Sequence, residues 1–166
     1  MWTADEALAQ LYAAHWRRLV RLAVLLVRDV GTAEEVVQDA FVAVHGRWDR
    51  LREPDRALAY LRQSVINHAR SALRHRKVVD RHAARRTPPE DEPGADQALL
   101  ASGRRAAVLD ALRALPDRQR EVLALRYYLD LSEAEIADTL GISRGAVKSH
   151  ASRGAAALRT LLEEEK

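Results

Sequence analysis

Residues 131–159 read LSEAEIADTLGISRGAVKSHASRGAAALR, and the spacing within this stretch decides how the C-terminal part of the chain folds. Ser132 and Glu135 form an S-x-x-E capping box ahead of apolar residues, which predicts the start of a helix. Gly141 ends that helix, and the hydroxyl of Ser143 is placed to cap the next one. The spacing therefore predicts a helix-turn-helix.

The second of these helices has two different faces. Apolar and small residues recur at intervals of four, three and four, which marks the side that packs inside: Val147, Ala151, Gly154 and Leu158. No acidic residue stands between Ser143 and Glu163. The other side carries cations and hydroxyls that can donate to phosphates and base edges: Arg144, Lys148, Ser149, Ser152 and Arg153. The alternative is an ordinary helical hairpin with a solvated basic face.

The composition limits the class of protein. The chain has 166 residues, of which 48% are hydrophobic and 31% charged, as is typical of one or two small folded domains. It contains no cysteine, which excludes disulfides and thiolate metal sites. No apolar run approaches the roughly 18 residues of a membrane span, and the first residues, MWTADEALAQ, do not resemble a signal peptide. We therefore expect a cytoplasmic protein without membrane insertion.

A break in the pattern divides the chain. Residues 87–95, TPPEDEPGA, replace helical periodicity with prolines, a glycine and acids, which is typical of a flexible linker. Helical periodicity continues on both sides, without an alternating strand pattern. We expect an all-α fold of two small helical domains, residues 1–86 and 97–166, joined by a flexible linker at residues 87–96.

The N-terminal part begins with a long apolar helix that we expect to end between Arg28 and Gly31. Thr32 and Glu35 form a second S/T-x-x-E pattern, which predicts the start of the next helix. One side of that helix mixes acidic, amide and apolar groups: Glu35, Gln38, Asp39 and Val42. These side chains form either ordinary solvent surface or a docking site for another protein.

A third helix is predicted to start near Pro54 and Asp55. Along one side of it an aromatic residue, two amides and two cations follow one another at helical spacing: Tyr60, Gln63, Asn67, Arg70 and Arg74. Aromatic rings stack unpaired bases, amides bind base edges, and cations hold the phosphates of a single strand. Between Arg62 and Arg86, eight cations are opposed only by Asp80. The stripe therefore indicates nucleic-acid binding, with solvated surface as the alternative.

Taken together, three segments resemble the extracytoplasmic-function (ECF) sigma factors of bacterial RNA polymerase. They are AEEVVQDAFVAVHGRW at residues 33–48, AYLRQSVINHARSALRHRK at residues 59–77, and ALPDRQREVLALRYYLDLSEAEIADTLGISRGAVKSHASRGAAALR at residues 114–159. The resemblance covers nearly everything outside the linker. It implies that residues 1–86 form sigma region 2 and residues 97–166 form sigma region 4.

The resemblance also implies roles for individual residues. In the family, the helix that corresponds to residues 33–45 docks on the clamp helices of the largest polymerase subunit, which implicates Glu35, Gln38, Asp39 and Val42. The family's minus-10 segment captures a flipped base, a role that falls here on Asn67. Its neighbours would hold the melted strand: Tyr60, Gln63, Arg70, Arg74, Arg76 and Lys77. The recognition helix reads the minus-35 duplex, which implicates Arg144, Lys148, Ser149, Ser152 and Arg153.

The expected mechanism is binding and not covalent chemistry. The partners implied by the resemblance are RNA polymerase core enzyme, promoter DNA and an anti-sigma factor, with no small-molecule substrate. The six histidines show no metal-ligand spacing, and no nucleophile stands in a recognisable triad, so we expect no metal, no cofactor and no enzymatic activity.

Two other classes of protein compete with this interpretation. The C-terminal half also resembles the DNA-binding domain of LuxR-type regulators, through the segments RQREVL, EIA, LGIS and VKSH. The N-terminal half argues against such a regulator, because a receiver domain would alternate strands with helices and carry an acidic phosphorylation pocket. A helical adaptor that binds polymerase without contacting DNA is the second alternative, and the cationic stripe argues against it.

Overall fold

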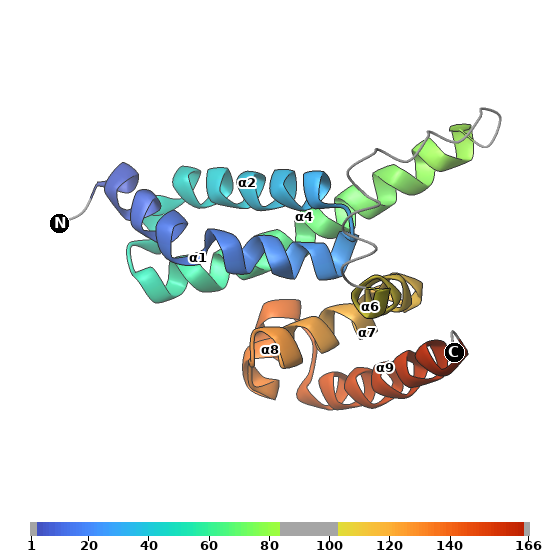
Figure 1. Cartoon of the computed structure of the whole chain (residues 1–166). Helices are drawn as coiled ribbons and strands as arrows, with labels where there is room; N and C mark the ends of the chain where they lie inside the picture. Colours follow the sequence, from blue (N-terminus) through green and yellow to red (C-terminus); the bar gives the residue numbers. More distant parts are fainter. Residues whose placement is uncertain (1–2, 84–102, 165–166) are drawn as a thin grey trace.

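The computed structural model describes residues 3–83 and 103–164, and within these residues every regular element is a helix. In chain order the helices are α1 (Ala4–Val27), α2 (Val30–Gly46), α3 (Trp48–Leu51), α4 (Pro54–Ala83), α6 (Gly103–Ala114), α7 (Asp117–Leu123), η1 (Ala124–Tyr128), α8 (Glu133–Leu140) and α9 (Arg144–Glu164). Figure 1 shows α1, α2 and α4 as one layer above the layer formed by α6 to α9. The expected all-α fold is confirmed. The predicted linker, residues 87–96, lies outside the described residues.

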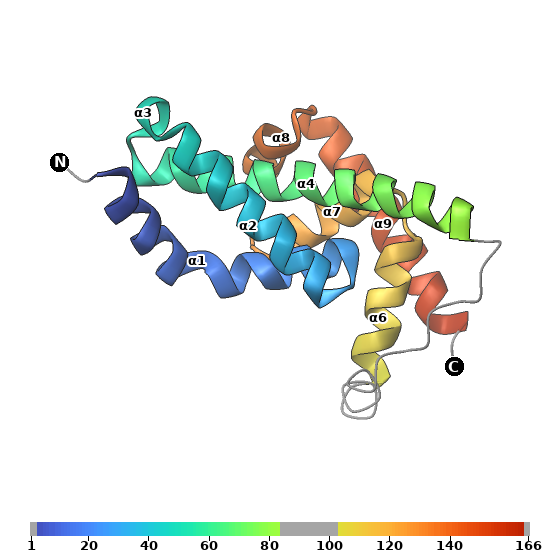
Figure 2. The ribbon, with the colours of Figure 1, turned by 90° about the horizontal axis from the view of Figure 1, so that it is seen from above.

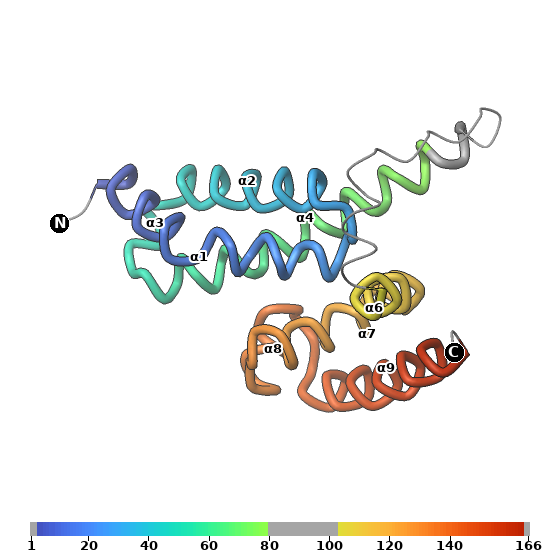
Figure 3. Tube along the Cα trace, in the orientation of Figure 1, coloured from blue at the N-terminus to red at the C-terminus, as the bar shows by residue number. Residues whose placement is uncertain are grey.

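The N-terminal layer is a bundle of α1, α2 and α4, with the short α3 between the last two (Figure 3). Its fully buried side chains come from all three long helices: Leu22, Leu26, Val37, Val44, Leu61 and Val65. Aromatic rings extend this core toward the start of α1. The rings of Tyr12 and Trp16 stack with centroids 4.6 Å apart, and Phe41 lies 5.4 Å from Tyr12. Burial of the aliphatic side chains and of Phe41 holds the bundle together, whereas Tyr12 is 46% exposed.

The start of α2 differs from the sequence-based expectation. Thr32 and Glu35 do not form the capping box, because α2 begins two residues before Thr32 and is capped by Asp29. The Asp29 carboxylate accepts hydrogen bonds from the backbone N–H of Thr32 at 2.8 Å and from its hydroxyl at 2.6 Å. A carboxylate is as effective a cap as a hydroxyl, and here it lies closer to the turn at Arg28, where φ is 69°.

The helix-turn-helix forms as predicted. The Ser132 hydroxyl accepts from the Glu135 N–H, and the Glu135 carboxylate accepts from the Ser132 N–H, each at 3.1 Å. Gly141 ends α8 with φ of 67°, a left-handed conformation that favours glycine. The Ser143 hydroxyl then accepts from the Ala146 N–H at 3.1 Å and caps α9. Local hydrogen bonds therefore define both ends of the turn.

The inner side of α9 packs closely on α7. Val147, Ala151 and Gly154 are buried. A Cβ atom added at Gly154 would lie 3.1 Å from Cδ1 of Leu123 and 3.2 Å from Cβ of Gln119. Only glycine allows this approach without displacing a neighbour. The packing orients α9 so that its opposite side faces outward.

The two layers share one continuous hydrophobic core. Buried side chains of α1, α2 and α4 join those of α7, η1, α8 and α9 in a single cluster. Leu25 of α1 also packs against a second, smaller cluster of the C-terminal layer. Seen from above, α4 lies across α7 and α8 (Figure 2). The N-terminal and C-terminal domains are therefore in direct contact.

Candidate nucleic-acid and protein interfaces

The outer side of α9 carries the residues that the sequence predicts for duplex DNA. All five are exposed: Arg144, Lys148, Ser149, Ser152 and Arg153. Lys148 Nζ lies 3.9 Å from Glu133 Oε2, but its side chain remains 70% exposed. Such an exposed pair contributes little and leaves the ammonium available to another anion. The structure thus brings three cations and two hydroxyls together on one open face.

The polar stripe of α4 is only partly open. Gln63, Asn67 and Arg74 are exposed, whereas Tyr60 and Arg70 are half-buried. The Arg47 guanidinium lies 5.5 Å from the centroid of the Tyr60 ring, a cation–π contact. Sequence reasoning missed Arg47, because it lies beyond the end of α2 and nothing in the local pattern connects it to α4. The contact places a further cation beside the predicted stacking residue.

Arg70 does not point to solvent but to the C-terminal domain. Its Nε and Nη2 donate to the two carboxylate oxygens of Glu121 at 2.6 and 2.5 Å. The Glu121 side chain, on α7, is only 3% exposed. Arg118 adds a weaker bond to the same carboxylate at 3.3 Å. Glu121 was not predicted as a functional residue, although an acid among apolar neighbours in REVLAL was the available signal.

The ionisation of this pair reflects its burial. Removal from water raises the pKa of Glu121, and the hydrogen bonds and charge of Arg70 offset part of that shift. In turn, the hydrogen bonds to Glu121 raise the pKa of the Arg70 guanidinium. The two hydrogen bonds between Arg70 and Glu121 satisfy both charged groups. Either charge buried without its partner would lower the free energy of unfolding.

Arg76 and Lys77, near the end of α4, differ in whether they have a partner among the residues that the structure describes. Arg76 Nη2 lies 3.3 Å from Asp29 Oδ2 and donates to the Thr32 hydroxyl at 3.4 Å, so it links α4 to the start of α2. Lys77 is exposed. Of the four cations predicted to hold the melted strand, Arg74 and Lys77 are therefore open, and Arg70 and Arg76 are paired within the protein.

The mixed face of α2 is open along its length. Its four residues are all exposed: Glu35, Gln38, Asp39 and Val42. The side chain of Val42 is among the most exposed apolar groups of the described residues, at 65%. An exposed valine beside acids offers apolar surface that a protein partner can bury, with release of ordered water.

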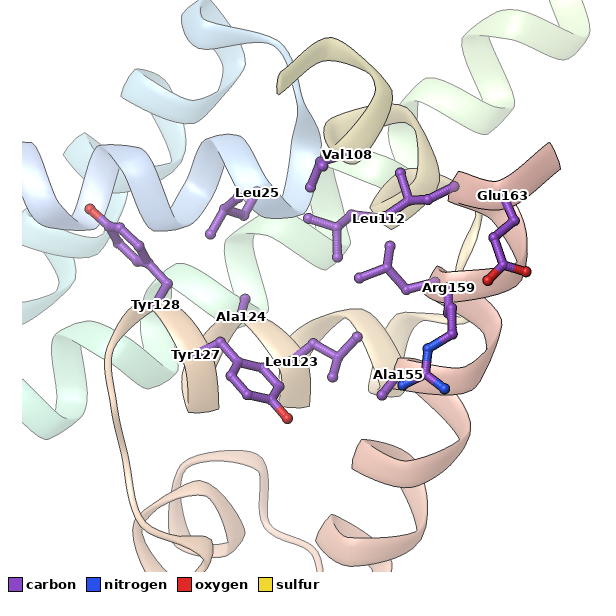
Figure 4. A pocket seen from close by; sticks show the side chains of 12 residues that line it. Leu25, Val108, Leu112, Leu123, Ala124, Tyr127, Tyr128, Ala155, Arg159 and Glu163 are labelled. Carbon is purple, nitrogen blue, oxygen red and sulfur yellow. The ribbon is translucent and has the colours of Figure 1, made fainter. Parts of the chain in front are cut away.

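Two grooves lie between the domains. The first, about 640 Å³ in volume, is apolar and is lined by α1, α6, α7, η1 and α9. Figure 4 shows Leu25, Leu112 and Leu123 converging on it, with Tyr127 and Arg159 at its rim. The second groove, about 580 Å³, is polar and separates α4 from α8. Its walls bring Tyr60 and Gln63 opposite Glu135 and Asp138. Sequence reasoning missed both grooves, since they exist only where the domains meet.

Two other kinds of site are absent from the part of the chain that the structure describes. Within residues 3–83 and 103–164, no cluster of histidine, aspartate and glutamate has the arrangement needed to hold a metal ion. Across the same residues, no helix is both long and apolar enough to cross a membrane.

Each half of the chain matches a known protein family. Residues 11–78 match the family described as Sigma-70 region 2, and residues 105–158 match the family described as Sigma-70, region 4. The region 2 match covers the half of the chain that a LuxR-type regulator would not share. That alternative is therefore not favoured.

The similarity to curated relatives covers most of the chain. It is 37% identical to the RNA polymerase sigma-E factor of Streptomyces avermitilis over 147 residues, which cover 87% of this chain and 79% of the relative. It is 35% identical to the ECF RNA polymerase sigma factor SigL of Mycobacterium tuberculosis, with 97% of this chain and 92% of the relative covered. CarQ, an RNA polymerase sigma factor of Myxococcus xanthus, is 34% identical over 97% of this chain and 92% of its own length.

Solved structures of other proteins have the same fold as this chain. CnrH, in a complex with the cytosolic domain of CnrY, superimposes with a TM-score of 0.72 and 27% identity over 98% of this chain and 96% of CnrH. The sigma factor RpoE of Bartonella quintana, in a complex with the anti-sigma factor NepR, has the same fold, with a TM-score of 0.73 and 22% identity over 95% of this chain and 98% of RpoE. With its two sigma-70 regions in order and its relatives matched over most of their length, the chain belongs to the ECF sigma factors of the sigma-70 family.

Proposed function

We propose that this chain binds RNA polymerase core enzyme and directs it to promoters through two separate DNA-contacting faces, one in each domain. The open basic side of α9, oriented by the helix-turn-helix, is the observation that carries the proposal. We assign region 2 to residues 1–86, the linker to residues 87–96 and region 4 to residues 97–166.

The minus-35 element is proposed to bind along α9. Three cations and two hydroxyls on its outer side can donate to phosphates and to base edges in a major groove: Arg144, Lys148, Ser149, Ser152 and Arg153. The absence of acids between Ser143 and Glu163 supports this assignment, because no carboxylate on that part of α9 repels the DNA backbone.

The minus-10 element is proposed to bind along α4 as a melted strand. Asn67 is exposed at the centre of the stripe, and its amide has the donor and acceptor needed to bind a base edge. We assign stacking or phosphate contacts to its neighbours on α4: Tyr60, Gln63, Arg70, Arg74, Arg76 and Lys77. Aromatic stacking and cationic contacts are the usual means of holding an unpaired strand.

The core enzyme is proposed to dock on the outer face of α2, through Glu35, Gln38, Asp39 and Val42. Exposure of all four residues supports this role. RpoE of Bartonella quintana is bound by an anti-sigma factor, and we propose that a protein of that kind also controls this chain. The proposed role is cytoplasmic and requires neither a cofactor nor catalysis by the chain itself.

Run-off transcription tests the proposal directly. The purified chain is mixed with core polymerase and genomic fragments, and discrete transcripts that depend on the added chain are expected. The Lys148→Ala, Arg153→Ala double variant should lose most transcription from promoters with a minus-35 element. Asn67→Ala should relax base preference in a minus-10 library by about 1 to 3 kcal/mol, or roughly 5- to 150-fold, per lost contact.

A matched control distinguishes the loss of these DNA contacts from a general loss of positive charge. Arg104→Ala with Arg105→Ala removes two exposed cations from α6 of the same domain, and it should transcribe like the unmodified chain. The proposal is wrong if the unmodified chain yields no chain-dependent transcript with core enzyme. The assignment to α9 is wrong if the two double variants behave alike.

A further inference from the structure

A carboxylate of α8 lies beside the basic outer side of α9. Oε2 of Glu133, the first residue of α8, is 3.9 Å from Nζ of Lys148, and the two side chains are 35% and 70% exposed. Between Ser143 and Glu163 the chain carries no acid. Figure 1 shows the start of α9 next to α8, with which it is in contact. The negative charge beside Lys148 therefore comes from the neighbouring helix.

The other acids of α8 have different surroundings. The Glu135 carboxylate accepts from the Ser132 N–H at 3.1 Å, and its hydrogen bonds with Ser132 lower its pKa. Glu135 and Asp138 both line the polar groove toward α4. Among the three acids of α8, Glu133 is therefore the one that is paired with a cation of α9.

Glu133 also has an ordinary structural role. An acid in the first turn of a helix interacts favourably with the unpaired N–H groups at that end. This role depends on the carboxylate alone and needs no cation from another helix. An exposed ion pair adds little to the stability of a fold. The pairing with Lys148, a predicted DNA contact, is therefore better explained by what it does to DNA binding.

The pair changes what Lys148 can gain from DNA. A free ammonium on a flexible stem is attracted to any phosphate, and such contacts supply affinity that does not depend on sequence. A carboxylate alongside brings the net charge of the pair close to zero, so the attraction to phosphates is largely cancelled. An ammonium has several N–H donors, so Lys148 can keep its contact with Glu133 and still donate to a guanine edge.

We propose that Glu133 is a specificity-determining residue for the minus-35 element: it positions the ammonium of Lys148 and makes its binding depend on a base edge and not on the nearest phosphate. The inference rests on the proposed role of α9 in minus-35 binding. Glu133 acts through Lys148 and need not contact DNA itself. It lowers the affinity for every duplex, and lowers it least for the duplex that offers Lys148 the correct base, so an unfavourable charge produces discrimination.

The experiment measures base preference and general DNA affinity in parallel. Holoenzyme reconstituted from core polymerase and the full chain transcribes a promoter library with a randomised minus-35 element, and sequencing of the transcripts gives the base preference at each position. Fluorescence anisotropy then reports binding of the full chain alone to a labelled duplex without a promoter, from low salt upward.

The variants change one charge at a time. Glu133→Gln keeps the size of the side chain and removes its charge, and Glu133→Asp keeps the charge. Asp138→Asn is the matched control, because it removes an equal charge from the side of α8 that lines the groove toward α4. Lys148→Ala identifies the positions of the minus-35 element that depend on Lys148.

For Glu133→Gln, the base preference should flatten by about threefold to tenfold at the positions that depend on Lys148. The duplex without a promoter should bind more tightly, with a salt dependence steeper by about one phosphate contact. Glu133→Asp should restore most of the original base preference. Asp138→Asn should match the unmodified chain in both measurements.

A double variant decides whether Glu133 acts through Lys148. In the Lys148→Ala background, Glu133→Gln should have no further effect on base preference. An equal effect with and without Lys148 would overturn the inference, and so would an unchanged base preference in Glu133→Gln. A purely structural role would lower the midpoint of thermal unfolding, followed by circular dichroism, and leave the base preference unchanged.

Failure of the proposed function gives a different result. It appears as the absence of chain-dependent transcripts from the library, or as a Lys148→Ala variant that keeps the base preference of the unmodified chain. The inference alone fails when Lys148→Ala changes the base preference and Glu133→Gln does not.

Discussion

Asp29 shows how one side chain sets the boundary of a helix. Its carboxylate accepts hydrogen bonds from the N–H and the hydroxyl of Thr32. Nη2 of Arg76, on α4, lies 3.3 Å from Oδ2 of Asp29. The hydroxyl bond, the N–H bond and, to a smaller extent, the charge of Arg76 lower the pKa of Asp29. One residue therefore caps α2 and links it to the end of α4.

The Asp29→Ala variant should lose about 1 kcal/mol of unfolding free energy at neutral pH, because the first turn of α2 loses its cap. Since the folded pKa of Asp29 is lowered, its contribution is complete above its ordinary pKa of about 4 and is lost as the pH falls through the lowered value. Urea unfolding at several pH values measures the difference between the two proteins. A difference that does not shrink in acid would contradict this role of the ionised carboxylate.

Arg120 shows the opposite case, a charged residue whose position no local pattern predicts. Its side chain is 5% exposed, and it donates to the carbonyl oxygens of Leu112, Arg113 and Leu115. Asp117 supplies the balancing charge at 3.1 Å. Arg120 thus satisfies carbonyls at the end of α6 that the helix itself leaves without partners, and it connects α6 to α7.

At the scale of elements, the direction in which α9 presents its basic face depends on close packing at Gly154. A side chain there would press on Leu123 and on Cβ of Gln119. The helix-turn-helix fixes where α9 begins, and this contact with α7 fixes how it is rotated.

Gly154→Val should lower the unfolding free energy by about 1 to 3 kcal/mol, because the added methyl groups overfill the contact with α7. Thermal unfolding followed by circular dichroism provides the measurement. The same substitution at Gly145 is the matched control, since a Cβ there meets only the Ser143 hydroxyl, at 3.9 Å. Equal losses at the two positions would show that close packing at Gly154 is not the cause.

At the scale of the whole molecule, the two domains are joined by apolar as well as ionic contacts. Leu25 of α1 packs against the cluster that contains Leu112, Leu115 and Leu123. Unfolding of one domain would therefore expose apolar surface of the other, and we expect the two domains to unfold as one cooperative unit.

We expect the chain to unfold in one calorimetric transition, and Leu25→Ala to separate it into two. Loss of this cross-domain contact should lower the free energy of unfolding by about 1 to 2 kcal/mol. The midpoint temperature of the first transition should then fall by about 4 °C or more. Leu8→Ala, a half-buried leucine in the first turns of α1, should lower the transition without dividing it. Two transitions already present in the unmodified chain would contradict the coupling.

Much of the fold and of the candidate site was predictable because it depends on short-range interactions. The Ser132–Glu135 capping box and the left-handed Gly141 join residues close together in sequence, and the recurrence of Val147, Ala151 and Gly154 marks the buried side of α9. The residues of α9 that are predicted to contact DNA follow directly, since they occupy the remaining side. Their roles remain predictions until promoters are tested.

The sequence by itself determined the all-α fold, the three long helices of the N-terminal domain, the helix-turn-helix and the face of α9 that points outward. Only the tertiary structure decided that Arg70 of α4 is bound to Glu121 of α7, since 51 residues separate the two in sequence. Capping and helical periodicity act within one or two turns, so they can be seen in the chain alone. The pairing of distant charges depends on how two finished domains pack, which no pattern within one helix reveals.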